Sequence, residues 1–178
     1  KEFQTSKGRK VYDGVGISPD VHHKSSEYSN ITNALLTEDA IFDFATRYYY
    51  SHSLENHEVF EFSDEDFTDF KDYLKEINFT YQTYSEQDLE DAMITAKEEG
   101  FDQDIIENYK QMLTDIEAYK KDELDEKKVE IVSLLTDEII KRFFYKEGLY
   151  NYYVKHNPEI LEATEILNDA TRYTEILK

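Results

Sequence analysis

Glycine and proline are scarce in this chain, and their scarcity limits the folds that the chain can adopt. The 178 residues include 5 glycines and 2 prolines, against a usual share of about 12% for the two types together. A β-sandwich or β-barrel needs a turn about every 8–12 residues, and such turns are rich in both residue types. We therefore do not expect an all-β fold for most of the chain, and we predict a mainly α-helical protein.

The composition also favours a folded chain over a disordered one. A mean hydropathy of −0.75 and a net charge of −20 are values found in disordered proteins, but 15 tyrosines and 11 phenylalanines are not, because disordered segments are poor in aromatic residues. The absence of cysteine excludes disulfides, thiolate zinc sites and a cysteine nucleophile. No apolar run approaches the length of about 18 residues that crosses a membrane.

The excess of acidic side chains lies almost entirely in residues 54–126. This segment contains 6 basic and 24 acidic residues, which gives it a net charge of −18. Such a field repels nucleic acids and anionic membranes. The segment is therefore either a set of solvated helix faces or a surface that attracts a cationic partner.

The first 28 residues differ from the rest of the chain. Short alternating segments flank Ser6-Lys7-Gly8-Arg9, a pattern that predicts a β-hairpin turn between two short strands. Residues 13–20 are typical of an irregular loop, and residues 23–28 of a polar connector. The chain begins at Lys1 without a methionine, and we interpret it as a piece of a longer protein.

From residue 29 onward the apolar residues follow helical spacing, and capping signals mark the helix starts. Thr37, Ser63 and Ser85 each precede acidic residues, which are favourable at the positive end of the helix dipole. Gly100 is placed to end the third of these helices. The next helix carries a seam, spaced four-three-four-three, that could pack along another helix. This seam consists of Ile105, Tyr109, Met112, Ile116 and Tyr119.

The last third of the chain continues the helical pattern. Residues 120–128 are almost wholly charged, and we favour the turn of a helical hairpin there over a solvated helix. An apolar stripe follows, and Gly148 is expected to interrupt or end its helix. Asn157-Pro158 predicts another helix start, a cap followed by proline at the first helical position. The stripe consists of Ile131, Leu134, Leu135, Ile139, Ile140 and Phe143.

These signals together predict a bundle-like helical domain of about five to seven helices over residues 29–178. A short β-hairpin or extended segment precedes it at the N-terminus. The sequence shows no convincing internal repeat and no low-complexity segment.

The sequence assigns no catalytic, cofactor-binding or metal-binding residue. With 40 acidic residues, chance carboxylate pairs are unavoidable, so no pair indicates a glycosidase. Asp64-Glu65-Asp66 lacks the glycine and the distal glutamate of a calcium loop, and Gly14-Val15-Gly16 is too short for a dinucleotide motif. The histidines are poorly spaced to share a metal ion. They are His22, His23, His52, His57 and His156.

Aromatic residues gather in two runs, residues 48–50 and 143–145, with Tyr150, Tyr152 and Tyr153 nearby. An exposed patch of rings could bind a peptide or a sugar. The alternative, which we favour, is that the rings seal helix junctions with their hydroxyl groups outward. Lys141-Arg142 is too small a basic group to bind nucleic acid against the overall charge.

Residues 8–20 read Gly-Arg-Lys-Val-Tyr-Asp-Gly-Val-Gly-Ile-Ser-Pro-Asp. They resemble the segment that closes the protease core in carboxy-terminal processing (tail-specific) serine peptidases, where the pattern is roughly Gly-Arg-x-x-Tyr-x-Gly-x-Gly-Ile-x-Pro-Asp. Val15 stands where a glycine is frequent. The helical part is similar to the C-terminal extension of Bacteroidetes-type members. The similar stretches are residues 35–50, 138–148 and 157–169.

The resemblance implies a periplasmic or cell-envelope endopeptidase that cuts protein substrates near their C-termini. It implies a serine nucleophile with a lysine general base, and a PDZ-like domain that holds the substrate tail. In the family these catalytic motifs precede the matched segment, so no catalytic residue is assigned here. Ser18 and Lys10 are not expected to form a dyad.

We therefore expect residues 1–22 to be the last strand segment of a peptidase core, joined by residues 23–28 to a non-catalytic helical domain at residues 29–178. Its role would be scaffolding, oligomer contact, or positioning of a substrate or adaptor. Its partners would be the upstream peptidase and PDZ-like domains, with no cofactor and no nucleic acid. The alternatives are an independent acidic module that binds proteins and a helical enzyme or binding protein for glycans.

Overall fold

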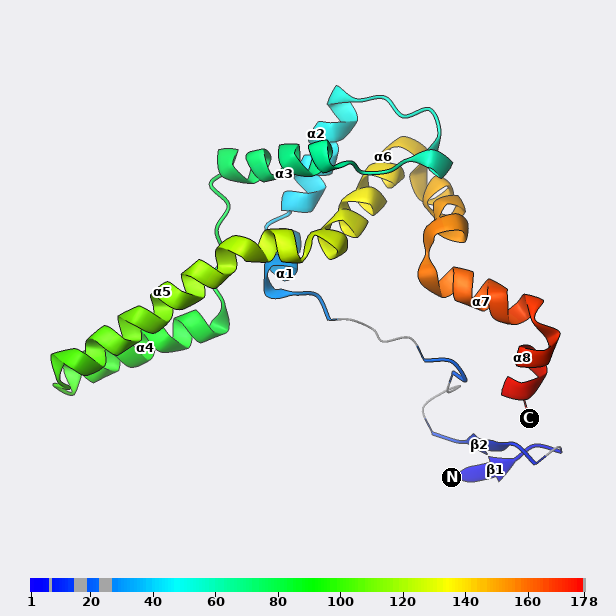
Figure 1. The fold of residues 1–178 in the computed structure, drawn as a ribbon, viewed down its shortest axis with the longest axis horizontal. Coiled ribbons are helices and arrows are strands. Elements are labelled where there is room, and N and C mark those ends of the chain that lie inside the picture. The colour runs from blue at the N-terminus through cyan, green and yellow to red at the C-terminus, as the bar shows by residue number, and fades with distance from the viewer. Residues whose placement is uncertain (7, 15–18, 23–26, 178) are drawn as a thin grey trace. The chain divides into compact units, whose positions relative to one another are not determined.

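The fold consists of a short β-hairpin followed by helices (Figure 1). The computed structural model describes residues 1–6, 8–14, 19–22 and 27–177. The mainly α-helical class and the N-terminal hairpin predicted from the sequence are confirmed, and the described residues form eight α-helices where we expected about five to seven. The elements are β1 (Glu2–Gln4), β2 (Lys10–Tyr12), α1 (Asn30–Thr37), α2 (Ala40–Ser51), the 3₁₀ turn η1 (His57–Val59), α3 (Asp64–Glu76), α4 (Tyr84–Glu98), α5 (Gln103–Glu126), α6 (Lys128–His156), α7 (Pro158–Asn168) and α8 (Ala170–Ile176).

The chain divides into two compact units. One comprises residues 28–145, and the other comprises residues 1–27 and 146–178. The boundary falls within α6 at Tyr145, whose backbone is non-helical with φ 58° and ψ −167°. The break expected at Gly148 is therefore wrong by three residues. Gly148 lies within the helix at a buried position, and one glycine inside a helix costs only about 1 kcal/mol, which is too little to end it. The domain boundaries drawn from the sequence remain a prediction.

The hairpin near the N-terminus pairs Phe3 with Val11 in an antiparallel register. Gly8 has φ +88°, a value that L residues rarely adopt, and its N–H donates to the Thr5 carbonyl at 2.9 Å. The guanidinium of Arg9 forms an ion pair with Asp20. The predicted hairpin is thus confirmed, while Lys7 within its turn and residues 15–18 and 23–26 lie outside the described residues.

The core of the unit at residues 28–145 is made by α1, α2, α3 and the first part of α6. These helices contribute the most deeply buried side chains, which confirms the apolar stripe predicted on α6. Phe44 on α2 also contacts the Phe70 ring of α3, with centroids 5.0 Å apart and an edge-to-face geometry. The fully buried side chains are Thr32, Leu35, Ile41, Phe70, Ile131, Leu135, Ile139 and Ile140.

Helices α4 and α5 lie side by side as a helical hairpin (Figure 1). Gly100, with φ +78°, follows the end of α4, as predicted. The predicted seam on α5 is partly wrong. Tyr109 and Ile116 are half-buried, but Ile105 and Met112 are 41% and 50% exposed. The buried face instead includes Ile106. Two overlapping apolar stripes run along α5, and packing against α4 buries the stripe with Ile106 and not the predicted stripe with Ile105.

Two predicted helix starts are confirmed. Ser63 begins α3 in a capping box with Asp66: the serine hydroxyl accepts from the Asp66 N–H at 3.1 Å, and the Asp66 carboxylate accepts from the Ser63 N–H at 2.8 Å. Asn157 begins α7, and its side-chain oxygen accepts from the Ile160 N–H at 3.0 Å. Both residues satisfy backbone donors that the first helical turn leaves unpaired.

Two other predicted starts are wrong. Thr37 is the last residue of α1, and its hydroxyl donates to the Asn33 carbonyl at 2.8 Å. The acidic residues after Thr37 suggested a helix start, but α1 begins earlier, at the Ser29 cap, whose hydroxyl accepts from the Thr32 N–H. Thr83, not Ser85, caps α4, because Thr83 and Glu86 form the capping box that holds Glu86 in a buried position.

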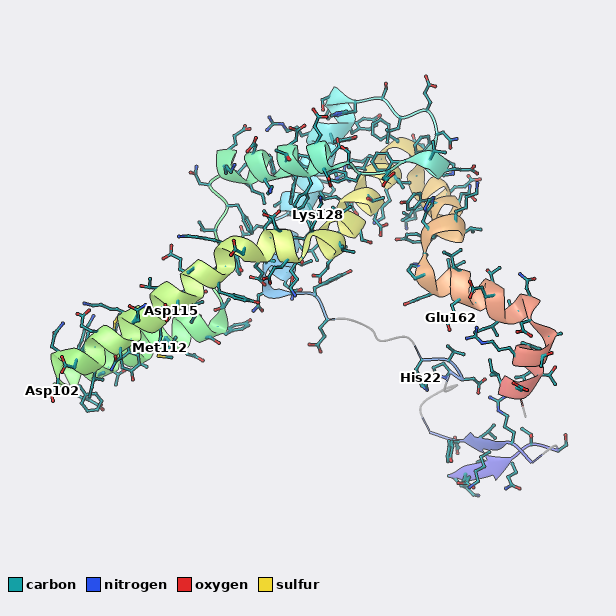
Figure 2. The ribbon with its side chains drawn as sticks, in the orientation of Figure 1. His22, Asp102, Met112, Asp115, Lys128 and Glu162 are labelled. Atoms are coloured by element: carbon teal, nitrogen blue, oxygen red, sulfur yellow. The ribbon has the colours of Figure 1, made fainter. Side chains whose placement is uncertain are left out.

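The helical-hairpin turn expected within residues 120–128 is also wrong. Helix α5 continues to Glu126, Lys127 interrupts it for one residue, and α6 starts at Lys128. In Figure 1, α6 runs on beyond the end of α5 and does not fold back along it. Figure 2 labels Lys128 close to the start of α6. Its ammonium pairs with Asp64 of α3 and lies 5.0 Å from the Phe67 ring centroid, so this charge has partners within the fold.

Candidate functional site

An extended segment, residues 79–83, joins α3 to α4 and borders two surface cavities. Burial alternates along it: Phe79, Tyr81 and Thr83 are half-buried, whereas Thr80 and Gln82 are exposed. This period of two is the pattern of a β-strand packed on one side. The rings of Phe79 and Tyr81 stack with centroids 6.3 Å apart. The segment therefore presents an ordered, strand-like backbone between the two cavities.

The first cavity has a volume of about 640 Å³ and lies between α3, α5 and the extended segment. Four lysines line it, and we call it the lysine cavity. Helix α3 contributes Lys71 and Lys75, and α5 contributes Lys120 and Lys121. Residues 54–126 contain six basic side chains in all. Four of these six thus meet at one place, within the most acidic part of the chain.

Lys120 is the most deeply placed of the four lysines. Its Nζ donates to both carboxylate oxygens of Glu86, at 2.8 and 3.0 Å, and to the Tyr81 carbonyl. The two charged side chains are 15% and 11% exposed. Burial by itself would raise the pKa of Glu86, but the hydrogen bonds from Lys120 and Thr83 outweigh burial and lower it. Glu86 therefore stays ionised and acts as a structural anchor.

Both the ring and the hydroxyl of Tyr81 contact charged side chains. Its ring lies 4.4 Å below the Lys120 ammonium, and its hydroxyl donates to the buried Glu123 carboxylate. Burial, followed by this hydrogen bond to Glu123, raises the pKa of Tyr81 well above its ordinary value. The hydroxyl thus remains a proton donor in the hydrogen bond near neutral pH and does not act as a base.

The two lysines of α3 are held more loosely. Lys71 pairs with Asp125 at 3.0 Å. Lys75 pairs with Asp72 at 2.8 Å, and both of these side chains are mostly exposed. Lys121 makes no ion pair with the described residues and is exposed. Because exposed pairs contribute at most about 1 kcal/mol, Lys75 and Lys121 can turn toward an anion at little cost.

The second cavity, of about 810 Å³, lies on the side of the extended segment nearer α1. Its lining is polar, and Glu38 is its one charged side chain among the described residues. Amides and hydroxyls of this kind can bind the uncharged backbone of a peptide. The polar lining includes Asn30, Asn33, Thr37, Thr80, Gln82, Thr83, Tyr84 and Gln87.

Three of the histidines lie against aromatic rings. The His52 ring stacks on Tyr48 with centroids 3.8 Å apart, the His156 ring stacks on Tyr152 at 4.1 Å, and His57 lies against Phe144. No group of three or more potential ligands that could hold a metal ion occurs among the described residues. His23 lies outside the described residues. Asp64 and Asp66 lie in the first turn of α3, where Asp64 pairs with Lys128 and Asp66 accepts from the Ser63 N–H.

The aromatic runs are divided between buried and exposed rings. Tyr48 is buried in the core, and Tyr49 contacts Phe143 with centroids 4.8 Å apart. The contact between Tyr49 and Phe143 joins α2 to α6. Tyr50 and Tyr145 are 82% and 78% exposed, so the runs also leave single rings at the surface.

Two matched positions in the segment that resembles a peptidase core contact each other. Arg9 and Asp20, both matched positions, form the ion pair noted above. Lys10 pairs with Glu2 at 3.0 Å, and Ser18 lies outside the described residues.

The lysine cavity was not predicted from the sequence. The sequence contains one indication of clustered lysines. Lys71 and Lys75 are four residues apart and so share a helix face. Lys120-Lys121 is the only other close pair of basic residues in the segment of residues 54–126. The extended segment between the helices, which brings these two pairs together, carries no comparable signal.

Residues 31–167 match the family model described as "Probable PDZ-protease, C-terminal helical domain". No curated protein matches the chain, and no solved structure does. Within the described residues, no helix has both the length and the apolar character needed to cross a bilayer.

Proposed function

Because this chain belongs to the family of C-terminal helical domains of probable PDZ-proteases, we propose that it positions protein substrates or an adaptor for a catalytic domain encoded upstream. The parent protein is then a serine endopeptidase that cuts near substrate C-termini with a serine–lysine dyad. Its compartment is the periplasm or cell envelope. The family match over residues 31–167 is the observation that carries the proposal.

The chemistry of the described side chains supports a non-catalytic role. The most buried ionisable groups around the cavities are engaged in structure: Glu86 caps α4 and binds Lys120, and Glu123 accepts from Tyr81. A general acid or base needs a pKa near the working pH. The pKa of Glu86 and the pKa of Tyr81 are moved away from that range in opposite directions.

The first test uses the chain by itself. Purified residues 1–178 are incubated with casein and, separately, with a fluorophosphonate probe that labels active serines. We expect no cleavage and no labelling. Casein fragments together with a labelled serine in this chain would overturn the non-catalytic assignment.

The second test uses the parent protease with residues 29–178 deleted. We expect cleavage of a folded protein with an unstructured C-terminal tail to fall at least about tenfold in kcat/KM, because remote binding contributes to positioning. Hydrolysis of a short peptide ester and labelling by the fluorophosphonate should persist. Unchanged cleavage of the tailed protein would contradict the proposal, and so would loss of ester hydrolysis with labelling intact.

A further inference from the structure

The lining of the lysine cavity is richer in lysine than the segment that surrounds it. Its lining contains four lysines and two acids, Glu117 and Asp125, whereas the segment of residues 54–126 carries a net charge of −18. Long-range repulsion disfavours a ligand with many negative charges near such a segment. A ligand that suits the cavity therefore carries a single anionic group and meets the lysines at short range.

The lysine cavity also has an apolar side. Leu74 and Ile31 are 6% and 4% exposed, and they line the cavity together with Phe79 and Leu124. Apolar lining with a few charged groups is typical of sites that bury the body of a ligand and fix its polar end. The complementary ligand is an apolar group that ends in, or lies beside, one carboxylate.

The extended segment indicates the form of that ligand. Thr80 and Gln82 are exposed, and neither makes a backbone–backbone hydrogen bond with the described residues. An extended peptide can add to such a segment as a neighbouring strand, because its own N–H and C=O groups supply the missing partners. The polar cavity on the other side of the segment suits the uncharged part of the same peptide.

We propose that the lysine cavity binds the C-terminal end of an extended polypeptide. The terminal carboxylate lies between Lys75 and Lys121, the two lysines without a strong internal partner. The last apolar side chain packs on Leu74, Phe79 and Leu124, and the preceding residues pair with the extended segment. The assignment of this polypeptide to a protease substrate rests on the proposed function, but the binding itself does not.

The test measures binding of one labelled peptide to the chain of residues 1–178 by fluorescence anisotropy. The probe is tetramethylrhodamine-Gly-Ser-Thr-Ala-Val-Leu with a free carboxylate, and its comparison is the same peptide with a C-terminal amide. The zwitterionic label adds no net charge, so the terminal carboxylate is the one net charge of the acid probe. We expect the acid to bind at least about fivefold more tightly than the amide, the size expected for a partly exposed ion pair. Equal affinities, or no binding of the acid up to about 1 mM, would overturn the proposal.

The chain offers a matched control for the lysines. The double variant Lys75→Gln/Lys121→Gln should remove the preference for the acid. The double variant Lys97→Gln/Lys110→Gln changes the other two basic residues of the segment, which do not line the cavity, and should keep the preference. An equal loss in both variants would mean general charge attraction and would contradict the proposed site.

A third peptide separates a terminal carboxylate from a side-chain carboxylate. An amidated peptide with one internal aspartate has the same net charge as the acid probe. We expect it to bind as weakly as the neutral amide, and binding as tight as that of the acid would refute a C-terminus site. None of these measurements involves proteolysis, so their failure is distinguishable from failure of the domain-deletion experiment.

Discussion

The guanidinium of Arg142 on α6 lies over the ring of Phe42 on α2, 4.3 Å from its centroid, and donates to the backbone carbonyl of the same residue at 2.8 Å. It also donates to the Thr46 hydroxyl at 3.1 Å and to the Glu138 carboxylate at 2.8 Å. The Arg142 side chain is 14% exposed. The guanidinium therefore lies between α2 and α6 and links the two helices.

The first prediction concerns this contact. Arg142→Lys should lower the free energy of unfolding by about 2 kcal/mol, because lysine keeps the charge but lacks the planar face and the forked donors. Urea denaturation followed by circular dichroism measures the change. Lys141→Gln, next to it and more exposed, should cost less than about 0.5 kcal/mol. Equal effects of the two variants would contradict the bridging role of Arg142.

The second prediction distinguishes the two candidate caps of α4. Thr83→Ala should destabilise the protein by about 1 kcal/mol, because it removes the acceptor for the Glu86 N–H. Ser85→Ala should change the free energy of unfolding by less than about 0.5 kcal/mol, since Ser85 is exposed within the helix. Thermal and urea unfolding measure both. If Ser85→Ala lowers the free energy of unfolding more than Thr83→Ala does, Ser85 is the cap of α4, as the sequence predicted.

The helix caps show which structural features can be predicted from the local sequence. Ser63 and Asn157 were identified because each stands alone before a helical stretch, and the cap depends only on residues within the next turn. Thr83 was missed because Ser85 offers the same signal two residues later. The spacing of Thr83 and Glu86 is itself the local signature of a capping box. The pairing of Glu86 with Lys120, 34 residues away, supports the same start but cannot be predicted from the local pattern.

The same division applies to the candidate site. The resemblance to a peptidase and the helical class were predicted from residues 8–20 and from apolar spacing, which are local in sequence. The lysine cavity requires α3, α5 and the extended segment to meet, so its geometry depends on tertiary packing. Arg142 illustrates the converse, since its sequence neighbourhood suggested a small basic surface and its side chain is mostly buried.

The third prediction concerns the break in α6. Tyr145 has φ 58° and ψ −167°, a region that only glycine occupies without strain, and strain of this kind costs about 1–3 kcal/mol. Tyr145→Gly should therefore stabilise the protein by about 1 kcal/mol after the entropy cost of glycine is included. The exposed ring contributes little packing. Thermal unfolding measures the change.

Tyr150 provides the control for this substitution. It is 62% exposed and lies within α6 after the break. Tyr150→Gly should destabilise the protein by about 0.5 kcal/mol, because glycine is a poor helix former. If both substitutions destabilise by the same amount, the conformation at Tyr145 is not strained and the prediction fails.

The fourth prediction concerns acid stability. Glu130 on α6 accepts from the Ser29 N–H at 3.0 Å and from the Ser29 hydroxyl at 3.1 Å, at the start of α1. Burial by itself would raise the pKa of Glu130, but hydrogen bonds from Thr32 and Ser29 outweigh it, so the pKa is lowered. The folded state therefore binds this proton less readily than the unfolded state. The contribution to stability is present above a pH of about 4.5 and is lost as the pH falls through the lowered pKa.

Glu130→Gln tests this contribution, because glutamine keeps an oxygen acceptor for Ser29 but cannot ionise. The variant should lose less stability than the wild type between a pH of about 5 and a pH of about 3, measured as urea midpoints. Glu126→Gln removes one charge from an exposed position and leaves the Ser29 contacts in place, so the difference between the two variants isolates those contacts. If both variants lose stability in parallel as the pH falls, the Glu130 carboxylate does not link α6 to α1 in the manner described.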